Sequence, residues 1–180
     1  MQSLRGKGVC PDVIDAFEEH GLTFLVTEMC AQSLTSYLQR HPAGLGLAQM
    51  RELAGALGRC LAGLRDAEIV HCDIKPDNIM LLRENDLRTI RFIDFGSATR
   101  GESPHEYLQA LGYRAPEVVF RCKPYNCAID LWSAGVVLFG ARTGRQLFHP
   151  ASNAELCLQM LCLLGTPPPE LAMHRFYTPA

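Results

Sequence analysis

The sequence predicts an α+β domain, in which short strands early in the chain are followed by longer helices. Two apolar runs at 13–17 and 22–26 are separated by polar residues and Gly21, a pattern typical of a β-hairpin. Apolar residues then recur at helical spacing over 47–67, and a nearly continuous apolar segment at 128–143 predicts another long helix. A chain of 180 residues has the size of one domain, or of part of a larger one.

The middle of the chain combines one helix with a second pair of strands. The helix is predicted over about Leu47 to Ala67 because its apolar residues follow steps of three and four: Met50, Leu53, Leu57, Leu61 and Leu64. Two further apolar runs, 79–82 and 90–93, flank a polar turn and predict the strand pair.

The last part of the chain is predicted to be helical. The segment 128–143 is apolar nearly all round, so we expect this helix to be buried in the core. Another helix is predicted to begin near Ser152, where Ser152 and Glu155 have the spacing of a capping box. Gly165 and the prolines at 167–169 end that helix.

Composition and charge exclude several classes of protein. A hydrophobic fraction of 48% with 20% charged residues is typical of a globular domain with a core. The formal net charge of −2 gives no reason to expect binding to nucleic acid or to a membrane surface. The start of the chain leads to no apolar run of the kind found in secretory signals, and the most apolar stretch, 134–141, is too short to span a bilayer.

The eight cysteines suggest either a disulfide or zinc framework, or a set of ordinary thiols. They are scattered and include no Cys-x-x-Cys pair. This spacing favours reduced, mostly buried thiols in an intracellular protein of the cytoplasm or nucleus.

The most informative motif runs from His71 to Asn78 (His-Cys-Asp-Ile-Lys-Pro-Asp-Asn) and is followed by Asp94-Phe95-Gly96. A carboxylate such as Asp73 is able to orient an incoming hydroxyl and accept its proton, and Lys75 offers positive charge to a phosphate. Asn78 and Asp94 supply the oxygen ligands that Mg²⁺ accepts. The alternatives are a loop aspartate bonded to backbone amides and a solvated surface lysine.

This order of residues resembles the catalytic and metal-binding loops of eukaryotic protein kinases. Downstream, Tyr-Arg-Ala-Pro-Glu at 113–117 and Asp-Leu-Trp-Ser-Ala-Gly at 130–135 follow the order that the family has after its activation loop. The resemblance implies a protein-kinase-like fold, mainly the helical C-lobe with a remnant of the N-lobe β-sheet. It also implies ATP and Mg²⁺ as cofactors and protein substrates with serine or threonine acceptors.

The resemblance also divides the chain and places the nucleotide. It implies an N-terminal segment at 1–12 and a partial kinase domain at 13–180, with the N-lobe remnant and hinge at 13–30 and the C-lobe at 31–180. Residues 25–30 resemble a kinase hinge. The implied nucleotide site comprises Thr27 as gatekeeper, the backbone of Glu28 and Cys30, Met80 beneath the base, and Asp77. The alternative for the hinge is an ordinary buried strand end.

Further details resemble one group of kinases. Cys72 stands where protein kinases commonly have an arginine. This feature resembles the group that contains the cyclin-dependent, mitogen-activated and dual-specificity tyrosine-regulated kinases. Tyr107 stands where the dual-specificity tyrosine-regulated and homeodomain-interacting kinases carry a tyrosine that they phosphorylate themselves. It is either such a site, with Arg114 as partner of the phosphate, or a packed tyrosine. Ala110 stands where the relatives usually have a serine or threonine. Leu111 and Gly112 stand where related chains have an arginine followed by an aromatic residue.

Two kinase hallmarks do not occur ahead of the hairpin. The sequence there contains neither Gly-x-Gly-x-x-Gly nor Val-Ala-Ile-Lys, so we expect a domain truncated in its N-lobe. The far C-terminal helices that the resemblance implies do not follow either, so we also expect truncation at the C-terminus. Two functions follow from this pattern. The first is a serine/threonine kinase, and the second is a catalytically impaired kinase-like module that binds proteins. In both, the scaffold residue Asp130 is implied to tie its helix to the catalytic loop.

Overall fold

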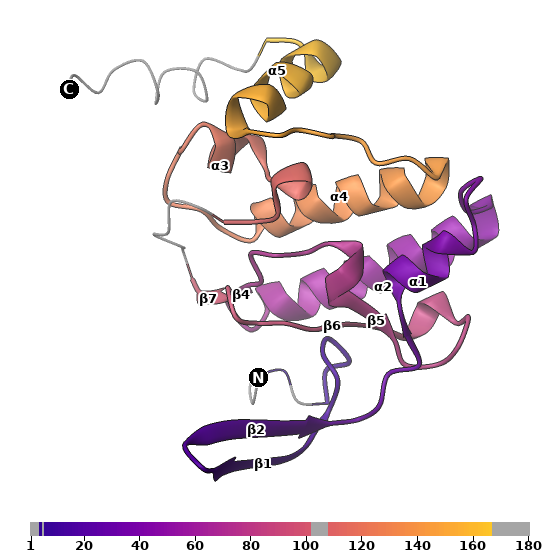
Figure 1. Cartoon of the computed structure of the whole chain (residues 1–180), viewed down its shortest axis with the longest axis vertical. Helices are drawn as coiled ribbons and strands as arrows, with labels where there is room; N and C mark the ends of the chain where they lie inside the picture. The colour runs from indigo at the N-terminus through magenta and orange to yellow at the C-terminus, as the bar shows by residue number, and fades with distance from the viewer. Residues whose placement is uncertain (1–3, 5, 102–107, 167–180) are drawn as a thin grey trace.

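The computed structural model describes Leu4 and residues 6–101 and 108–166. Within these residues five α-helices combine with three small antiparallel sheets, so the predicted α+β class is confirmed. The elements are stacked along the longest axis of the molecule (Figure 1). A β-hairpin forms one end, α2 (Leu47–Arg65) and α4 (Ala128–Thr143) form the middle, and α5 (Asn153–Leu164) forms the other end.

The predicted hairpin consists of β1 (Val13–Glu19) and β2 (Leu22–Thr27). The strands are antiparallel, and Phe17 faces Phe24 with ring centroids 5.1 Å apart. The turn places His20 and Gly21 at positive φ. Nearly every residue of both strands is exposed to solvent.

Three residues that precede the hairpin belong to the main core. Leu4, Val9 and Cys10 are buried, and the amide of Phe92 donates to the carbonyl of Val9 at 2.7 Å. The sequence shows no periodicity in this segment from which such packing is predicted.

Two elements between the hairpin and α2 have no counterpart in the sequence prediction. The short strand β3 (Gln32–Ser33) pairs with β5 (Ile79–Leu81), and α1 (Leu34–Gln39) follows it. The Oγ of Ser33 accepts the amide hydrogen of Ser36 at 3.1 Å and caps α1. Helix α2 matches its prediction within two residues, and its buried side is Leu53, Ala56, Leu57, Cys60 and Leu64.

The second predicted strand pair is β5 with β6 (Ile90–Phe92), so that prediction is also confirmed. A further small sheet joins β4 (Ile69–Val70) to β7 (Thr99–Arg100). Short 3-10 turns occur as η2 (Pro76–Asn78), η3 (Leu87–Thr89) and η4 (Leu111–Tyr113), and the four-residue helix α3 spans Pro116–Val119.

Helix α4 has the predicted bounds but only one side of it is buried. Leu131 is 64% exposed and Phe139 is 40% exposed, which corrects the expectation of a helix enclosed in the core. Helix α5 begins as predicted, since Ser152 Oγ accepts from the amide of Glu155 at 3.2 Å. Glu155 reaches back to the amide of Ala151, one residue before the position of a capping box.

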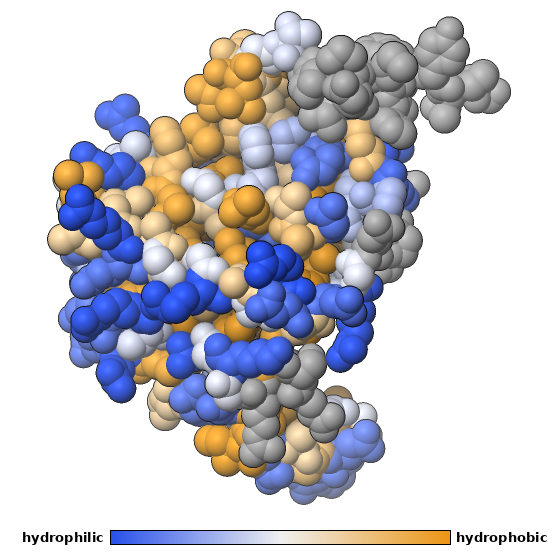
Figure 2. Space-filling model, turned by 180° about the vertical axis from the view of Figure 1, so that it is seen from behind, coloured by the Kyte–Doolittle hydropathy of each residue, from blue (hydrophilic) through white to orange (hydrophobic). Residues whose placement is uncertain are grey.

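Exposed apolar side chains gather at the end of the molecule formed by α5 (Figure 2). They include Leu158, Leu163 and Leu164, each more than half exposed. In the described part of the chain no helix has the length and apolar character needed to span a membrane. All eight cysteines are thiols rather than disulfides.

A glycine pair joins the loop after α1 to the end of α4. Gly44 and Gly144 both have positive φ, and the amide of Leu45 donates to Ala141 O at 2.7 Å. A Cβ on Gly44 would lie 2.1 Å from the carbonyl oxygen of Arg142. A Cβ on Gly144 would likewise lie 2.0 Å from that of Pro42, so the two segments approach through backbone alone.

Candidate active site

The loop between β4 and β5 is fixed by a buried carboxylate of α4. Asp130 Oδ2 accepts from the amide of His71 at 2.6 Å, and Oδ1 accepts from the amide of Cys72 at 3.0 Å. Burial raises the pKa of Asp130 to about 6, although the two amide bonds act in the opposite direction. The tie that the resemblance implies between this helix and the catalytic loop is therefore present.

Cys72 adopts a left-handed conformation with φ of 67° inside this loop. Its side chain is completely buried. Burial, followed by the nearby Asp130 carboxylate, raises the pKa of the thiol to about 12. Cys72 therefore supplies a neutral group where the resemblance has an arginine.

His71 stabilises the loop through hydrogen bonds at both nitrogens of its ring. Its Nε2 lies 3.0 Å from Ile93 O, and its Nδ1 accepts from the amide of Asp73 at 3.3 Å, which fixes the proton on Nε2. The ring packs against Phe95 with centroids 4.7 Å apart. Burial lowers the pKa of His71, while the Ile93 bond and the carboxylates of Asp73 and Asp94 oppose the shift. The imidazole is thus a neutral structural group at neutral pH.

Three predicted site residues meet at one carboxylate. Asp73 Oδ2 accepts from Lys75 Nζ at 2.7 Å and from Asn78 Nδ2 at 2.9 Å. Its Oδ1 accepts from the amide of Ala110 at 3.2 Å. Asn78 Nδ2 also donates to the carbonyl of Asp73 at 2.9 Å. The carboxylate plane of Asp73 is therefore set from both of its oxygens.

The fourth predicted residue, Asp94, follows β6 and comes directly after Ile93. The amide of Ile93 donates to Asn78 O at 3.0 Å, which places the ends of the two segments side by side. Asp94 has φ of 60°, and its Oδ1 accepts from the amide of Gly96 at 3.3 Å. Since Asn78 makes both of its bonds through nitrogen, its amide oxygen and the Asp94 carboxylate remain as ligands of the kind that suits Mg²⁺.

The predicted hinge residues lie where β2 rejoins the body of the protein. The amide of Glu28 donates to Asp12 O at 2.9 Å, and its carboxylate accepts from the amide of Asp12 at 3.0 Å. Thr27 Oγ1 donates to Glu28 O at 3.3 Å. The residue after Cys30 donates its amide to Leu81 O on β5, next to Met80. The residue after Cys30 thus joins the end of the predicted hinge to β5, the strand that contains Met80.

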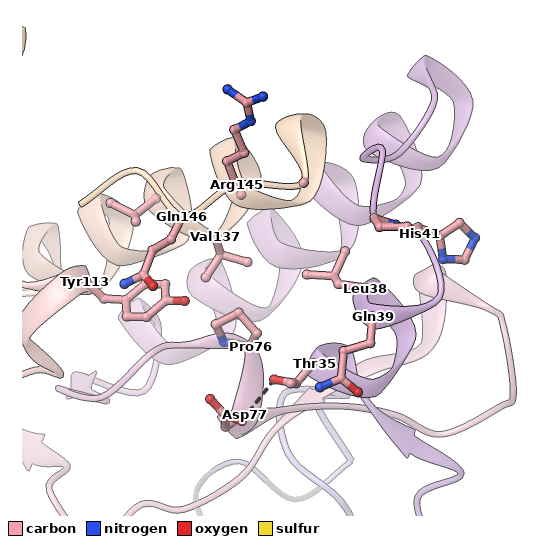
Figure 3. A pocket seen from close by; sticks show the side chains of 14 residues that line it. Thr35, Leu38, Gln39, His41, Pro76, Asp77, Tyr113, Val137, Arg145 and Gln146 are labelled. Atoms are coloured by element: carbon pink, nitrogen blue, oxygen red, sulfur yellow. Dashed lines mark hydrogen bonds between the residues drawn. The ribbon is translucent and has the colours of Figure 1, made fainter. Parts of the chain in front are cut away.

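Asp77 lines a cavity of about 480 Å³ between α1, η2 and α4 (Figure 3). Its Oδ1 accepts from Thr35 Oγ1 at 3.0 Å. Tyr113 and Gln146 line the same cavity, whereas Asp73, Asn78 and Asp94 are not among its lining residues. Asp77 is thus the one predicted site residue among those that line this cavity.

The segment that begins at Leu108 contributes a residue that the sequence did not reveal. Tyr107 itself lies outside the described residues. Arg114, its proposed partner, donates to Leu108 O and Gln109 O, both at 2.9 Å, and contacts Asn153. Gln109 is buried, and the only sequence signal for it is a lone amide between apolar neighbours.

The family is decided by comparison with known proteins. A family model described as the protein kinase domain matches residues 1–170. The chain belongs to this protein kinase family. Among similar proteins is the serine/threonine-protein kinase ppk15 of Schizosaccharomyces pombe, 35% identical over 156 residues. That match covers 86% of this kinase chain and 29% of ppk15.

Dual specificity tyrosine-phosphorylation-regulated kinase 3 is similar as well. The proteins of Rattus norvegicus and Mus musculus are each 36% identical over 129 residues, which cover 71% of this chain. The match covers 22% of each relative, so this chain spans less than a third of the length of the kinases that it resembles.

Proposed function

We propose that the chain carries the phosphoryl-transfer centre of a protein serine/threonine kinase. The observation that carries the proposal is the convergence of Lys75, Asn78 and Ala110 on the Asp73 carboxylate. In this proposal the helical elements form the C-lobe of the kinase fold and the β1–β2 hairpin belongs to its N-lobe sheet. The domain then begins at about residue 13, with the hinge ending at residue 30.

Asp73 acts in this proposal as the base that receives the proton of the substrate hydroxyl. Its carboxylate is only 19% exposed and is held at both oxygens, so it has a defined direction before substrate arrives. Lys75 is partly buried next to it, where its ammonium offsets negative charge on the transferring phosphoryl group.

Asn78 and Asp94 hold Mg²⁺ in this proposal through their side-chain oxygens. When bound, the metal neutralises charge on the phosphates of ATP and draws them into line. Thr27, Glu28, Cys30 and Met80 contact the base of ATP along the hinge and β5. Asp77 completes the nucleotide site through its backbone, because its side chain is bonded to Thr35.

The substrates in this proposal are proteins with serine or threonine acceptors, phosphorylated in the cytoplasm or nucleus. Two features support this: membership of the family and the similarity to a serine/threonine-protein kinase. The small net charge of −2 offers no surface reason to add nucleic acid or membrane as a partner.

The test is transfer of labelled phosphate from ATP to a serine/threonine peptide library by the purified chain with Mg²⁺. Asp73→Asn is expected to abolish transfer, because the amide cannot accept the proton. Asp66→Asn is the matched control, since Asp66 is an exposed carboxylate that pairs with Arg65. Equal transfer by wild type and Asp73→Asn contradicts the assignment of the base.

A second candidate is a catalytically impaired kinase-like module that binds proteins. It is favoured by Ala110, which brings no side-chain hydroxyl to Asp73, and by the exposed leucines of α5. The same assay separates the two functions. A folded wild type without measurable transfer supports the module.

A further inference from the structure

Gln109 lies between the catalytic loop and α4 and is 7% exposed. Its Nε2 donates to the carbonyl of Ile129 at 2.7 Å and to Ser133 Oγ at 2.8 Å. Its Oε1 accepts from the amide of Ala115 at 2.8 Å. Both hydrogens and the oxygen of the side-chain amide are thus engaged, by the start of α4 and by the segment before α3.

The backbone of Gln109 joins the same residue to the catalytic loop. Its amide donates to Cys72 O at 2.9 Å, and its carbonyl accepts from Arg114 Nη2 at 2.9 Å. Its φ is 66°, in the left-handed region that a glutamine seldom adopts. Such a conformation persists where the surrounding contacts determine it, and here the three side-chain bonds do so.

The next residue makes the contact that matters for the proposed chemistry. The amide of Ala110 donates to Asp73 Oδ1 at 3.2 Å. Because residues 109 and 110 run beside 72 and 73, the direction of this amide depends on the conformation of Gln109. Ala110 has only its backbone to offer, so no side chain of its own maintains the contact.

We propose that Gln109 is a positioning residue that holds the amide of Ala110 against the Asp73 carboxylate. Through it, α4 sets the orientation of the base at Oδ1, whereas Lys75 and Asn78 bond Oδ2. The effect of Gln109 on catalysis rests on the proposed function. The hydrogen bond between the Ala110 amide and Asp73 does not depend on that function.

The side chain is tested by Gln109→Ala and by the nearly isosteric Gln109→Glu. Alanine removes all three anchors. Glutamate keeps an acceptor for the amide of Ala115 but places an oxygen against the carbonyl of Ile129. Gln159→Ala is the matched control, because Gln159 also bonds a backbone amide, of His149, and a side chain, of Glu155, but on α5.

The first measurement is hydrogen exchange of the whole chain, which needs no activity. Both Gln109 variants are expected to exchange the Ala110 amide at least about tenfold faster, relative to the amides of α2, because the amide loses its partner. Gln159→Ala is expected to leave it unchanged. An unchanged Ala110 amide overturns the proposal, and so does equal acceleration in α2, which indicates general destabilisation alone.

The second measurement is the kinetics of transfer. Gln109→Ala is expected to lower kcat at least about tenfold and to change KM for ATP less than about twofold, since only the base is misdirected. An unchanged kcat together with faster exchange at Ala110 overturns the positioning role. If wild type shows no transfer, the proposed function fails, and the exchange result alone decides whether Gln109 holds Ala110 against Asp73.

Discussion

The catalytic loop and the β1–β2 hairpin are both short segments attached to the same helical body, but they are held in different ways. The loop is tied from α4 by Asp130, from β6 through His71 and from the activation segment through Ala110. The hairpin pairs with itself, and its exposed residues include the apolar Ile14, Phe17, Leu22, Phe24, Leu25 and Val26.

This difference distinguishes two parts of the proposed site, the catalytic loop and the hinge. Asp73, the proposed base, is held by partly buried hydrogen bonds, and its loop is anchored to Asp130 by two buried ones, which resist displacement. The hinge follows a two-stranded ribbon, a structure that is marginal by itself in water. We therefore expect the nucleotide side of the site to open more easily than the base.

The largest effect is expected from removing Asp130, which anchors the catalytic loop to α4. Asp130→Ala leaves the amides of His71 and Cys72 without acceptors, and we expect the free energy of unfolding to fall by ~2–5 kcal/mol. Urea unfolding measures this change, with the exposed Asp66→Ala as control, for which we expect less than ~0.5 kcal/mol. A loss below ~1 kcal/mol for Asp130→Ala would mean that the loop is held mainly by other contacts.

The same anchor predicts a pH dependence of stability. The pKa of Asp130 is raised from 3.8 to about 6 on folding, so the folded state binds the proton more tightly. Its contribution is full below pH 3.8 and is lost as the pH rises through about 6, on the order of 2–3 kcal/mol. His71, whose pKa is lowered from 6.5, acts in the opposite sense and lowers stability as the pH falls below 6.5.

The measurement is the free energy of unfolding of wild type and Asp130→Asn between pH 4 and pH 7. As the pH rises and Asp130 ionises, we expect the free energy of unfolding of the wild type to fall relative to that of Asp130→Asn. Parallel curves would show that the carboxyl of Asp130 has the same pKa in the folded and unfolded chain.

The smallest expected effect concerns the hairpin and sharpens the comparison. Phe24→Ala removes one ring of the stacked pair, but the residue is 40% exposed, so we expect a global loss of less than ~1 kcal/mol. Amides of β1 and β2 are expected to exchange faster than those of β5 in wild type and faster still in the variant. A loss as large as that of Asp130→Ala would show that the hairpin is part of the global folding unit.

Local patterns in the sequence were sufficient for the hairpin, α2, α4 and the strand pair β5–β6. Periodicity extends over the whole of α2, and for α4 a continuous apolar segment ends at Gly144, which provides the left-handed cap. Helix α1 has only six residues, too few for a periodic signal. The exposure of Leu131 was also missed, because apolar composition does not tell which side of a helix is covered.

Within the candidate site, spacing in the motif predicted which residues come from one loop but not what reaches them from elsewhere. Lys75 and Asn78 are close to Asp73 in sequence, so their meeting was expected. Gln109 reaches Ser133 across 24 positions, and Thr35 reaches Asp77 across 42. Contacts of that range depend on tertiary packing, which a single sequence does not encode in any local pattern.

The glycine pair at 44 and 144 limits how this chain is able to vary over evolutionary time. Many tight contacts between side chains are relieved by a second substitution that removes atoms from the partner. Here each added Cβ would meet a backbone carbonyl oxygen, of Arg142 or of Pro42, and no replacement of an amino acid removes a backbone atom. A second substitution therefore cannot compensate for the loss of either glycine. Substitutions in this region are confined to neighbouring residues that leave the close approach of the two backbone segments unchanged.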